Sequence, residues 1–244
     1  VTVITSEEIT ASQPFTANEV LKKVPGLTVR DEDGLGLRPN ISVRGLFGDR
    51  SRKMLLLEDG VPISLAPYGE NASYYSPEID RIERVEVRKG SGSIPFGPQT
   101  IGGVVNFITP PPPATPQSTV KVTGGSNNYK SIQLFYGGTW NNTGLVASIL
   151  HKQGDGPRSP MPFTISDFTG KYHTELTGNS DLLLKIHYYN EDAKVSYTGL
   201  TPNEYEVDPL QNTAVNDSLY VERAGFSLLH RLALDESELN TVFY

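Results

Sequence analysis

The sequence contains no cysteine, and this absence removes several kinds of site together. Without cysteine the chain can form no disulfide framework and no thiolate zinc site, and it has no cysteine nucleophile. The histidines do not supply a metal site in their place, because none follows another at the spacing of a motif such as H-x-x-x-H. These histidines are His151, His173, His187 and His230. We therefore expect no resident metal and no cofactor in this chain.

Positive charge and long apolar runs are also scarce. The formal net charge is −7, whereas a nucleic-acid-binding protein normally presents a basic face, so we expect no nucleic-acid partner. No apolar run approaches the roughly 18–20 residues that a membrane-spanning helix needs. A transmembrane barrel strand needs only about 9–11 residues and is apolar at every second position, so this absence leaves barrel proteins open.

A proline run divides the chain of 244 residues, which is long enough for one large or two ordinary domains. Residues 110–113 are all proline, and Pro116 follows. Consecutive prolines can neither donate to a sheet nor continue a helix, and they favour a stiff extended spacer. We therefore predict a domain over residues 1–109, a linker over residues 110–117 and a second domain over residues 118–244.

The first domain has the pattern of a mixed α/β fold. Apolar residues at helical spacing predict a helix over residues 17–24, with Thr16 as N-cap, Glu19 at the capping-box position and Pro25-Gly26 as the stop. Asp59-Gly60 predicts a tight turn after a strand. The predicted strands are residues 1–5, 27–30, 41–44, 54–58 and 84–88.

The second domain alternates apolar and polar residues with a period of two. Over residues 182–188, for example, leucine, isoleucine and tyrosine alternate with Lys185 and His187. Glycine and asparagine turns separate such stretches, at residues 125–128, 141–144 and 178–179. This pattern is typical of an up-and-down barrel with room here for about six or seven strands. A soluble antiparallel sheet with one wet face produces the same alternation, so periodicity alone leaves both open.

Patterns that would indicate an enzyme are incomplete. The glycine-rich stretch at residues 90–97 lacks the Lys-Ser/Thr ending of a phosphate-binding loop and leads into a strand rather than a helix. Glu58 and Asp59 are neighbours on a predicted strand, so their carboxylates point to opposite faces. No Ser-His-Asp arrangement can be assembled from the sequence, and we expect the chain not to be an enzyme.

Five segments in the first domain occur together in one known family. They read VITSEEI at residues 3–9, EVLKKVPGL at 19–27, ISVRGL at 41–46, LLLEDGVPI at 55–63 and RIERVEVRKG…FG…GGVVNFIT at 81–109. In this order they resemble the plug domain of TonB-dependent outer-membrane receptors. The resemblance implies an α+β plug domain followed by the N-terminal strands of an antiparallel transmembrane β-barrel, located in the bacterial outer membrane.

The same resemblance implies that the chain is a fragment. Receptors of this type close with about 22 strands around a lumen that the plug fills. An open sheet in hydrocarbon would leave the backbone groups of two edges unpaired. We expect further strands after Tyr244, and before Val1 the short energy-coupling segment that contacts TonB.

Within the family the likeness is nearest to the ferric-citrate type of receptor. It rests on Arg-Ser-Arg at residues 50–52, Ala-Pro-Tyr-Gly at 66–69, Phe-Gly-Pro-Gln at 96–99 and the stretch 199–209. The resemblance implies that plug-apex loops present arginines to an anionic ferric chelate, and a planar guanidinium suits carboxylates. Glu70, where that type carries glutamine, would make the site less suited to free citrate. The expected substrate-binding residues are Arg50, Arg52, Tyr68, Glu70 and Asn71.

The function implied by this resemblance is TonB-dependent uptake of a ferric chelate by a monomer. The partners would be TonB with its inner-membrane energy-coupling complex, the chelate and outer-membrane lipid. The resemblance also implies that Arg44 and Arg88 pair with glutamates of the barrel wall. The alternative is a non-transporting ligand-binding module of the cell envelope, with an α+β part followed by an antiparallel sheet.

Overall fold

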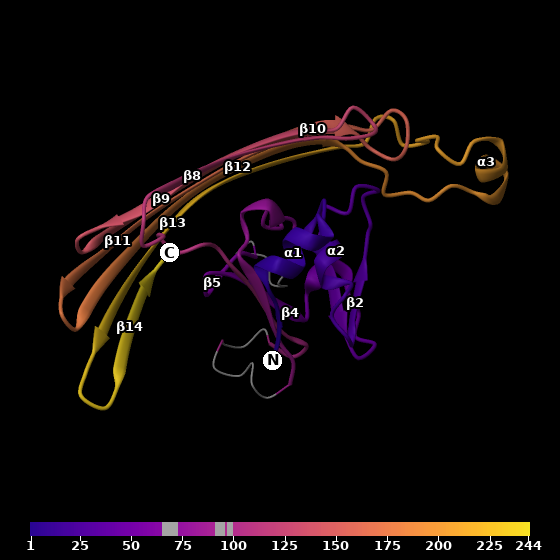
Figure 1. Cartoon of the computed structure of the whole chain (residues 1–244). Helices are drawn as coiled ribbons and strands as arrows, with labels where there is room; N and C mark the ends of the chain where they lie inside the picture. The colour runs from indigo at the N-terminus through magenta and orange to yellow at the C-terminus, as the bar shows by residue number, and fades with distance from the viewer. Residues whose placement is uncertain (65–72, 91–95, 97–99) are drawn as a thin grey trace. The chain divides into compact units, whose positions relative to one another are not determined.

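The computed structural model describes residues 1–64, 73–90, 96 and 100–244. The chain forms two compact units (Figure 1). The first consists of Val1–Thr109 together with Val195–Asp217, and the second of Pro110–Lys194 together with Ser218–Tyr244. No helix among the described residues is both long enough and apolar enough to cross a membrane.

The first unit is built on a five-stranded sheet in which one pair, β4 with β7, is parallel and the other pairs are antiparallel. A separate antiparallel pair, β2 with β3, lies in the same unit. The larger sheet has the order β1 (Thr2–Ile4), β6 (Arg84–Arg88), β7 (Gly103–Ile108), β4 (Met54–Glu58) and β5 (Val61–Pro62). The other elements are α1 (Ser6–Ser12), α2 (Ala17–Leu21), β2 (Leu27–Arg30), β3 (Asn40–Val43), η1 (Asp49–Ser51), η2 (Ile79–Arg81) and, in the segment 195–217, α3 (Pro202–Val207).

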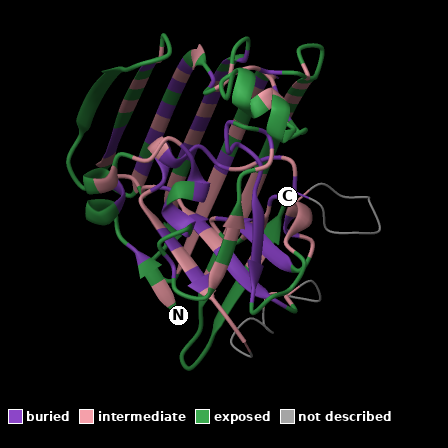
Figure 2. Ribbon diagram, turned by 90° about the vertical axis from the view of Figure 1, so that its right-hand side faces the viewer, coloured by how far each residue is buried: buried purple, intermediate pink, exposed green. Residues whose placement is uncertain are grey.

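The core of this unit lies around the central strands of the larger sheet, which are purple in Figure 2. All five residues of β4 are buried, so side chains on both faces of this strand are covered. Strand β6 instead alternates, with Val85 and Val87 fully buried and the three charged residues that alternate with them half-buried. The alternating charged and apolar pattern of residues 84–88 therefore produces a strand with one buried face.

The strand predictions for this unit are close to the observed strands. Strands β2, β4 and β6 have the predicted bounds, whereas β3 ends at Val43, one residue earlier than predicted. It ends there because Arg44 adopts a left-handed conformation with φ of 52° in a turn with Gly45. The predicted Asp59-Gly60 turn is confirmed, with both residues at positive φ between β4 and β5.

The helix prediction needs two corrections. Helix α2 ends at Leu21 rather than at residue 24, and its N-cap, Thr16, makes no side-chain capping hydrogen bond. The Glu19 carboxylate accepts instead from the backbone N–H of Phe15, at 3.3 Å. The capping box belongs to α1, which was not predicted, where Thr5 and Glu8 cap each other's backbone N–H groups. Both sites have the spacing of a capping box and an extended N-cap residue, so the spacing alone does not show which one closes the box.

The Gly102-Gly103 pair allows a close approach of three backbone segments. The Gly102 N–H donates to the Lys53 carbonyl at 2.7 Å, and a Cβ on Gly102 would lie 2.7 Å from that same oxygen. Gly103 has φ of 138°, and a Cβ there would lie 2.3 Å from the carbonyl oxygen of Arg88. This is a physical reason for two consecutive glycines at the start of β7.

Gly103→Ala is expected to destabilise the first unit by about 2–3 kcal/mol, because both the backbone strain and the clash with a backbone oxygen must be relieved. Gly60→Ala is the matched control. Gly60 also has positive φ, but no atom lies within 4 Å of its would-be Cβ, so only about 1 kcal/mol is expected. Thermal unfolding of the purified receptor would compare the two, and equal losses would contradict the close-approach argument.

The second unit is a seven-stranded antiparallel sheet whose strands follow one another in chain order. Two of its hairpins have two-residue turns, at residues 141–142 and 178–179. The strands are β8 (Gln117–Gly124), β9 (Lys130–Trp140), β10 (Thr143–Asp155), β11 (Pro162–Thr177), β12 (Ser180–Lys194), β13 (Ser218–Ala233) and β14 (Glu238–Phe243). Antiparallel strands are thus confirmed as the content of this region.

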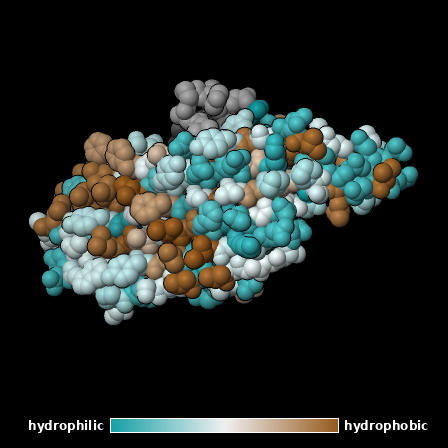
Figure 3. Space-filling view, turned by 90° about the horizontal axis from the view of Figure 1, so that it is seen from above, coloured by the Kyte–Doolittle hydropathy of each residue, from teal (hydrophilic) through white to brown (hydrophobic). Residues whose placement is uncertain are grey.

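The two faces of this sheet differ in polarity. On β12, Ile186 and Tyr188 are 45% and 41% exposed, whereas Lys185, which precedes Ile186, is only 7% exposed. On the buried face the imidazole Nε2 of His187 lies 3.0 Å from the Asp167 carboxylate on β11. Figure 3 looks down on the exposed face, where apolar side chains gather in patches. The apolar residues of the alternation are therefore the exposed ones, which is the reverse of the faces of a soluble sheet.

Candidate ligand-binding site

Arg50 lies in the short turn η1, which follows β3. Hydrogen bonds fix the backbone of Arg50 in this turn. The residue is left-handed, with φ of 51° and ψ of 25°. Its N–H donates to Asn40 Oδ1 at 2.7 Å, and its carbonyl accepts from the N–H of Ser73 at 2.9 Å. A non-glycine residue held in this region is uncommon and is often found at functional sites. The backbone thus sets the direction in which the Arg50 side chain leaves the loop.

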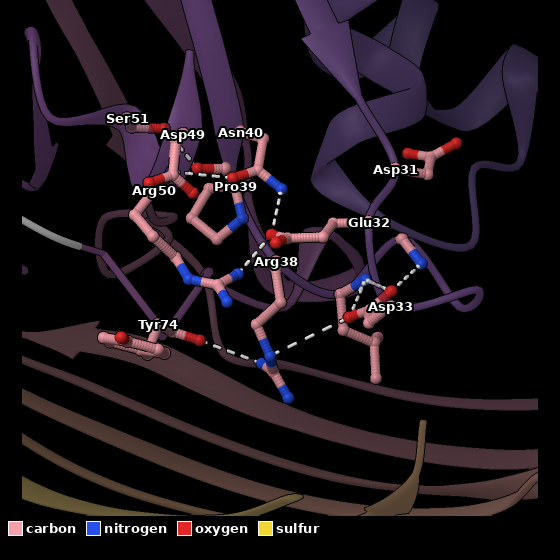
Figure 4. Close-up of polar contacts among 12 residues, drawn as sticks. Asp31, Glu32, Asp33, Arg38, Pro39, Asn40, Asp49, Arg50, Ser51 and Tyr74 are labelled. Atoms are coloured by element: carbon pink, nitrogen blue, oxygen red, sulfur yellow. Dashed lines mark hydrogen bonds and ion pairs between the residues drawn. The ribbon is translucent and has the colours of Figure 1, made fainter. Parts of the chain in front are cut away.

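The Arg50 guanidinium points toward the carboxylate of Glu32 (Figure 4), with which it forms an ion pair and a hydrogen bond. Asn40 Nδ2 donates to the same Glu32 oxygen, Oε2, at 2.8 Å. The Arg50 side chain is 13% exposed and that of Glu32 is 32% exposed. Asn40 therefore holds both ends of the pair, the backbone of Arg50 and the carboxylate of Glu32.

Two tyrosine rings also lie close to the Arg50 guanidinium. Its guanidinium carbon lies 4.8 Å from the ring centroid of Tyr74 and 5.5 Å from that of Tyr197, in the range of cation–π contacts. Tyr197 belongs to the segment 195–217 between β12 and β13, which is part of the first unit. The segment is tied down next to this ring, since the Ser196 N–H donates to the Asp33 carbonyl at 3.1 Å.

A buried polar framework supports the loop that carries Glu32. The carboxylate of Asp33, itself fully buried, accepts from the backbone N–H groups of residues 35–37. Arg38, only 1% exposed, lies with its Nε 3.8 Å from Asp33 and donates to the Tyr74 carbonyl at 2.9 Å. Buried charges are stable only when paired and hydrogen-bonded. This framework therefore holds the loop that follows Glu32 and binds the carbonyl of Tyr74.

The sequence-predicted site residues are found in different situations. Arg52 lies on the same loop as Arg50 but pairs with Asp49 at 3.1 Å, and both side chains are about one-third exposed. Tyr68, Glu70 and Asn71 lie outside the described residues. The site role of all five residues stays a prediction. Arg50 and Arg52 each already have a carboxylate partner, Glu32 and Asp49, which the sequence did not reveal.

The two arginines expected to contact a barrel wall lie on the surface of the first unit. Arg44 is exposed in the turn after β3. Arg88, at the end of β6, is 38% exposed, with its guanidinium 3.7 Å from Glu86 and 5.3 Å from the ring centroid of Phe96. Their pairing with barrel glutamates stays a prediction.

The chemistry available around Arg50 is that of recognition. Guanidinium groups and aromatic rings bind planar or anionic ligands without any bond being made or broken. Across the described residues there is no group of three or more histidine, aspartate or glutamate side chains placed to hold a metal ion. Sequence reasoning missed Glu32, Tyr74 and Tyr197, because they reach Arg50 only through the fold.

Comparison with known proteins relates the N-terminal part of the chain to a family. Residues 1–104 match the model of the TonB-dependent Receptor Plug Domain. A vitamin B12 transporter, BtuB, of Vibrio vulnificus is 37% identical over 129 residues, covering 53% of this chain and 20% of the relative. BtuB of Photobacterium profundum is 32% identical over 236 residues, covering 93% of this chain and 37% of the relative.

Solved structures resemble the whole chain. The ferric citrate transporter FecA, in the unliganded form, matches with a TM-score of 0.86 and 25% identity over 98% of this chain and 38% of FecA. The ferric enterobactin receptor PfeA, at 20% identity and a TM-score of 0.74, matches 99% of this chain and 40% of its own, and shares the fold. The chain thus spans well under half the length of these relatives.

Proposed function

The chain belongs to the TonB-dependent outer-membrane receptors, and we propose that it serves the active uptake of a ferric chelate across the bacterial outer membrane. The family confirms the expected fold class, a plug domain followed by barrel strands, and the outer-membrane location. It also confirms that the protein is a receptor rather than an enzyme. Membership favours transport over the non-transporting envelope module, which remains the alternative.

Different parts of the chain divide the work in this proposal. Residues 1–109 form the plug, residues 110–117 the linker, and residues 118–244 the first part of the barrel, although the segment 195–217 is part of the same compact unit as residues 1–109. The exposed apolar face with Ile186 and Tyr188 contacts outer-membrane lipid. Arg44 and Arg88 pair with glutamates of the completed barrel wall. No resident cofactor takes part, and the metal enters only within the transported chelate.

Energy for uptake comes from outside the chain. TonB, with its inner-membrane energy-coupling complex, transmits the force that rearranges the plug, and the receptor works as a monomer. These partners follow from the family, whose members are named for their dependence on TonB.

The substrate class rests above all on the environment of Arg50. A guanidinium fixed by its backbone and flanked by two tyrosine rings is suited to an anionic, carboxylate-bearing chelate. The structural likeness to a ferric citrate transporter supports the same class. A corrinoid is the second candidate, because both curated relatives are named as vitamin B12 transporters. The site residues proposed for the chelate are Arg50, Arg52, Tyr68, Glu70 and Asn71.

Growth experiments separate the two substrates. A strain lacking the gene is expected to lose growth under iron limitation on at least one chelate from a panel of ferric siderophores and ferric citrate. In a cobalamin auxotroph, the same deletion is expected to leave growth on vitamin B12 unchanged. Complementation with the full-length gene is the control. Loss of growth on vitamin B12 alone would replace the chelate with a corrinoid.

A further inference from the structure

The ion pair between Arg50 and Glu32 bears on how an anionic substrate would be recognised. A substrate carboxylate and the Glu32 carboxylate would compete for the same guanidinium, because Glu32 already occupies one of its terminal nitrogens. Glu32 is also kept in place by Asn40, at 2.8 Å, so it does not simply swing away into solvent. Glu32 therefore offsets part of the positive charge of Arg50, and an anion gains less from this guanidinium than from an arginine without a carboxylate partner, whether it displaces Glu32 or binds the other N–H groups.

Tyr197 bears on the position of the same guanidinium. It approaches Arg50 from the segment 195–217, whose backbone is hydrogen-bonded at Ser196 to Asp33, next to Glu32. Arg50 is thus held by contacts from three parts of the first unit: the loop of Glu32, the residue Tyr74 and the segment 195–217. The Arg50 side chain is only 13% exposed, whereas Tyr197 is 37% exposed, so this contact is shielded from water mainly on the side of the arginine.

We propose that Glu32 is a built-in counter-ion that limits the affinity of the apex for anionic chelates, and that Tyr197 is a positioning residue that joins the segment 195–217 to Arg50. This inference rests on the proposed function for the identity of the ligand, though the Arg50–Tyr197 contact stands without it. In the ligand-free receptor Glu32 and Tyr197 together hold Arg50. A chelate that takes Arg50 from Glu32 loosens the segment 195–217 at the same time.

The first arm of the test measures binding to the full-length receptor. Glu32→Gln removes the charge but keeps an oxygen for Asn40, and it is expected to tighten binding of ferric dicitrate, or of the chelate identified by growth, about tenfold. A role of Glu32 in structure alone could not raise affinity. Asp31→Asn is the matched control, since it removes the same charge one residue earlier from a carboxylate that pairs with Lys22. The affinity of the Asp31→Asn receptor for the same chelate is expected to stay at the wild-type value.

The second arm needs no ligand. Because the sequence has no cysteine, a single cysteine at Asn203 in α3 would carry a nitroxide label as the reporter of the segment 195–217. Tyr197→Ala and Glu32→Gln are each expected to increase the mobility of this label in the ligand-free receptor. Tyr197→Phe, which keeps the ring, is expected to restore the wild-type spectrum. Tyr205→Ala, which removes a tyrosine 62% exposed in the same segment, is the control and is expected to change nothing.

The two arms fail in different ways. Unchanged or weaker chelate binding by Glu32→Gln would overturn the counter-ion while leaving ferric-chelate uptake in place. An unchanged label spectrum in Tyr197→Ala would overturn the role of Tyr197, whatever the substrate.

If the wild-type receptor binds cyanocobalamin and no ferric chelate, the proposed function fails. An unchanged spectrum in Glu32→Gln would then overturn the counter-ion, and increased mobility would support the ion pair as the link between Arg50 and the segment.

Discussion

Replacing Arg50 and Arg52 together by alanine is expected to weaken binding of the transported ferric chelate by about a hundredfold or more. A hydrogen bond to a charged group contributes roughly 1.5–3 kcal/mol, and each 1.4 kcal/mol corresponds to about tenfold in affinity. The structure adds a second cause, since the double variant would leave Glu32 and Asp49 without the arginines that now neutralise them. Their carboxylates would then repel an anionic chelate.

Equilibrium binding to the full-length receptor is the measurement. A matched control is the double variant Lys23→Ala/Arg84→Ala, which removes two positive charges from the same unit at residues outside the apex loops. That control should bind within about twofold of wild type, because exposed charges contribute little. Unchanged affinity of Arg50→Ala/Arg52→Ala for every transported chelate would leave these arginines as ordinary loop charges.

Arg81→Ala is expected to destabilise the plug unit by about 3–5 kcal/mol, since it removes the arginine that is paired with the buried carboxylate of Glu58. Two nitrogens of Arg81 contact the two oxygens of the Glu58 carboxylate, at 2.7 and 2.9 Å, and one of them also donates to the Tyr75 hydroxyl at 2.7 Å. The side chains are 2% and 6% exposed, so water cannot replace the lost partner. This group ties η2 to β4.

Calorimetric unfolding of the purified receptor would measure this loss. The double variant Glu58→Leu/Arg81→Met is expected to be less destabilised than Arg81→Ala, because replacing both partners of a buried pair removes the unpaired charge. Arg84→Ala provides the control, since this arginine is paired with Glu83 and Glu86 but is 42% exposed, and its loss should change stability by less than about 1 kcal/mol. Comparable losses for Arg81→Ala and Arg84→Ala would argue against the buried pair as a stabilising group.

Local patterns were sufficient for much of the fold. The alternating residues 84–88 and the apolar run 54–58 became strands with the predicted bounds, because a strand depends on its own periodicity and on the turn residues beside it. The period-two stretches after the proline run became an antiparallel sheet for the same reason. Helix caps were less predictable: Thr5 and Thr16 both stand three residues before a glutamate, and only Thr5 closes the capping box.

The sequence by itself pointed to the family of this protein, because each of the five plug segments is a continuous run of residues. Their turns, glycines and alternation can be read residue by residue. It also singled out Arg50 as a cation in a loop. Only the tertiary structure decided what surrounds that cation. Glu32 and Tyr197 lie in loops distant in sequence, and their approach to Arg50 depends on buried contacts such as those of Asp33. No local pattern specifies contacts of this kind, since they depend on how the loops pack together once the sheet has formed.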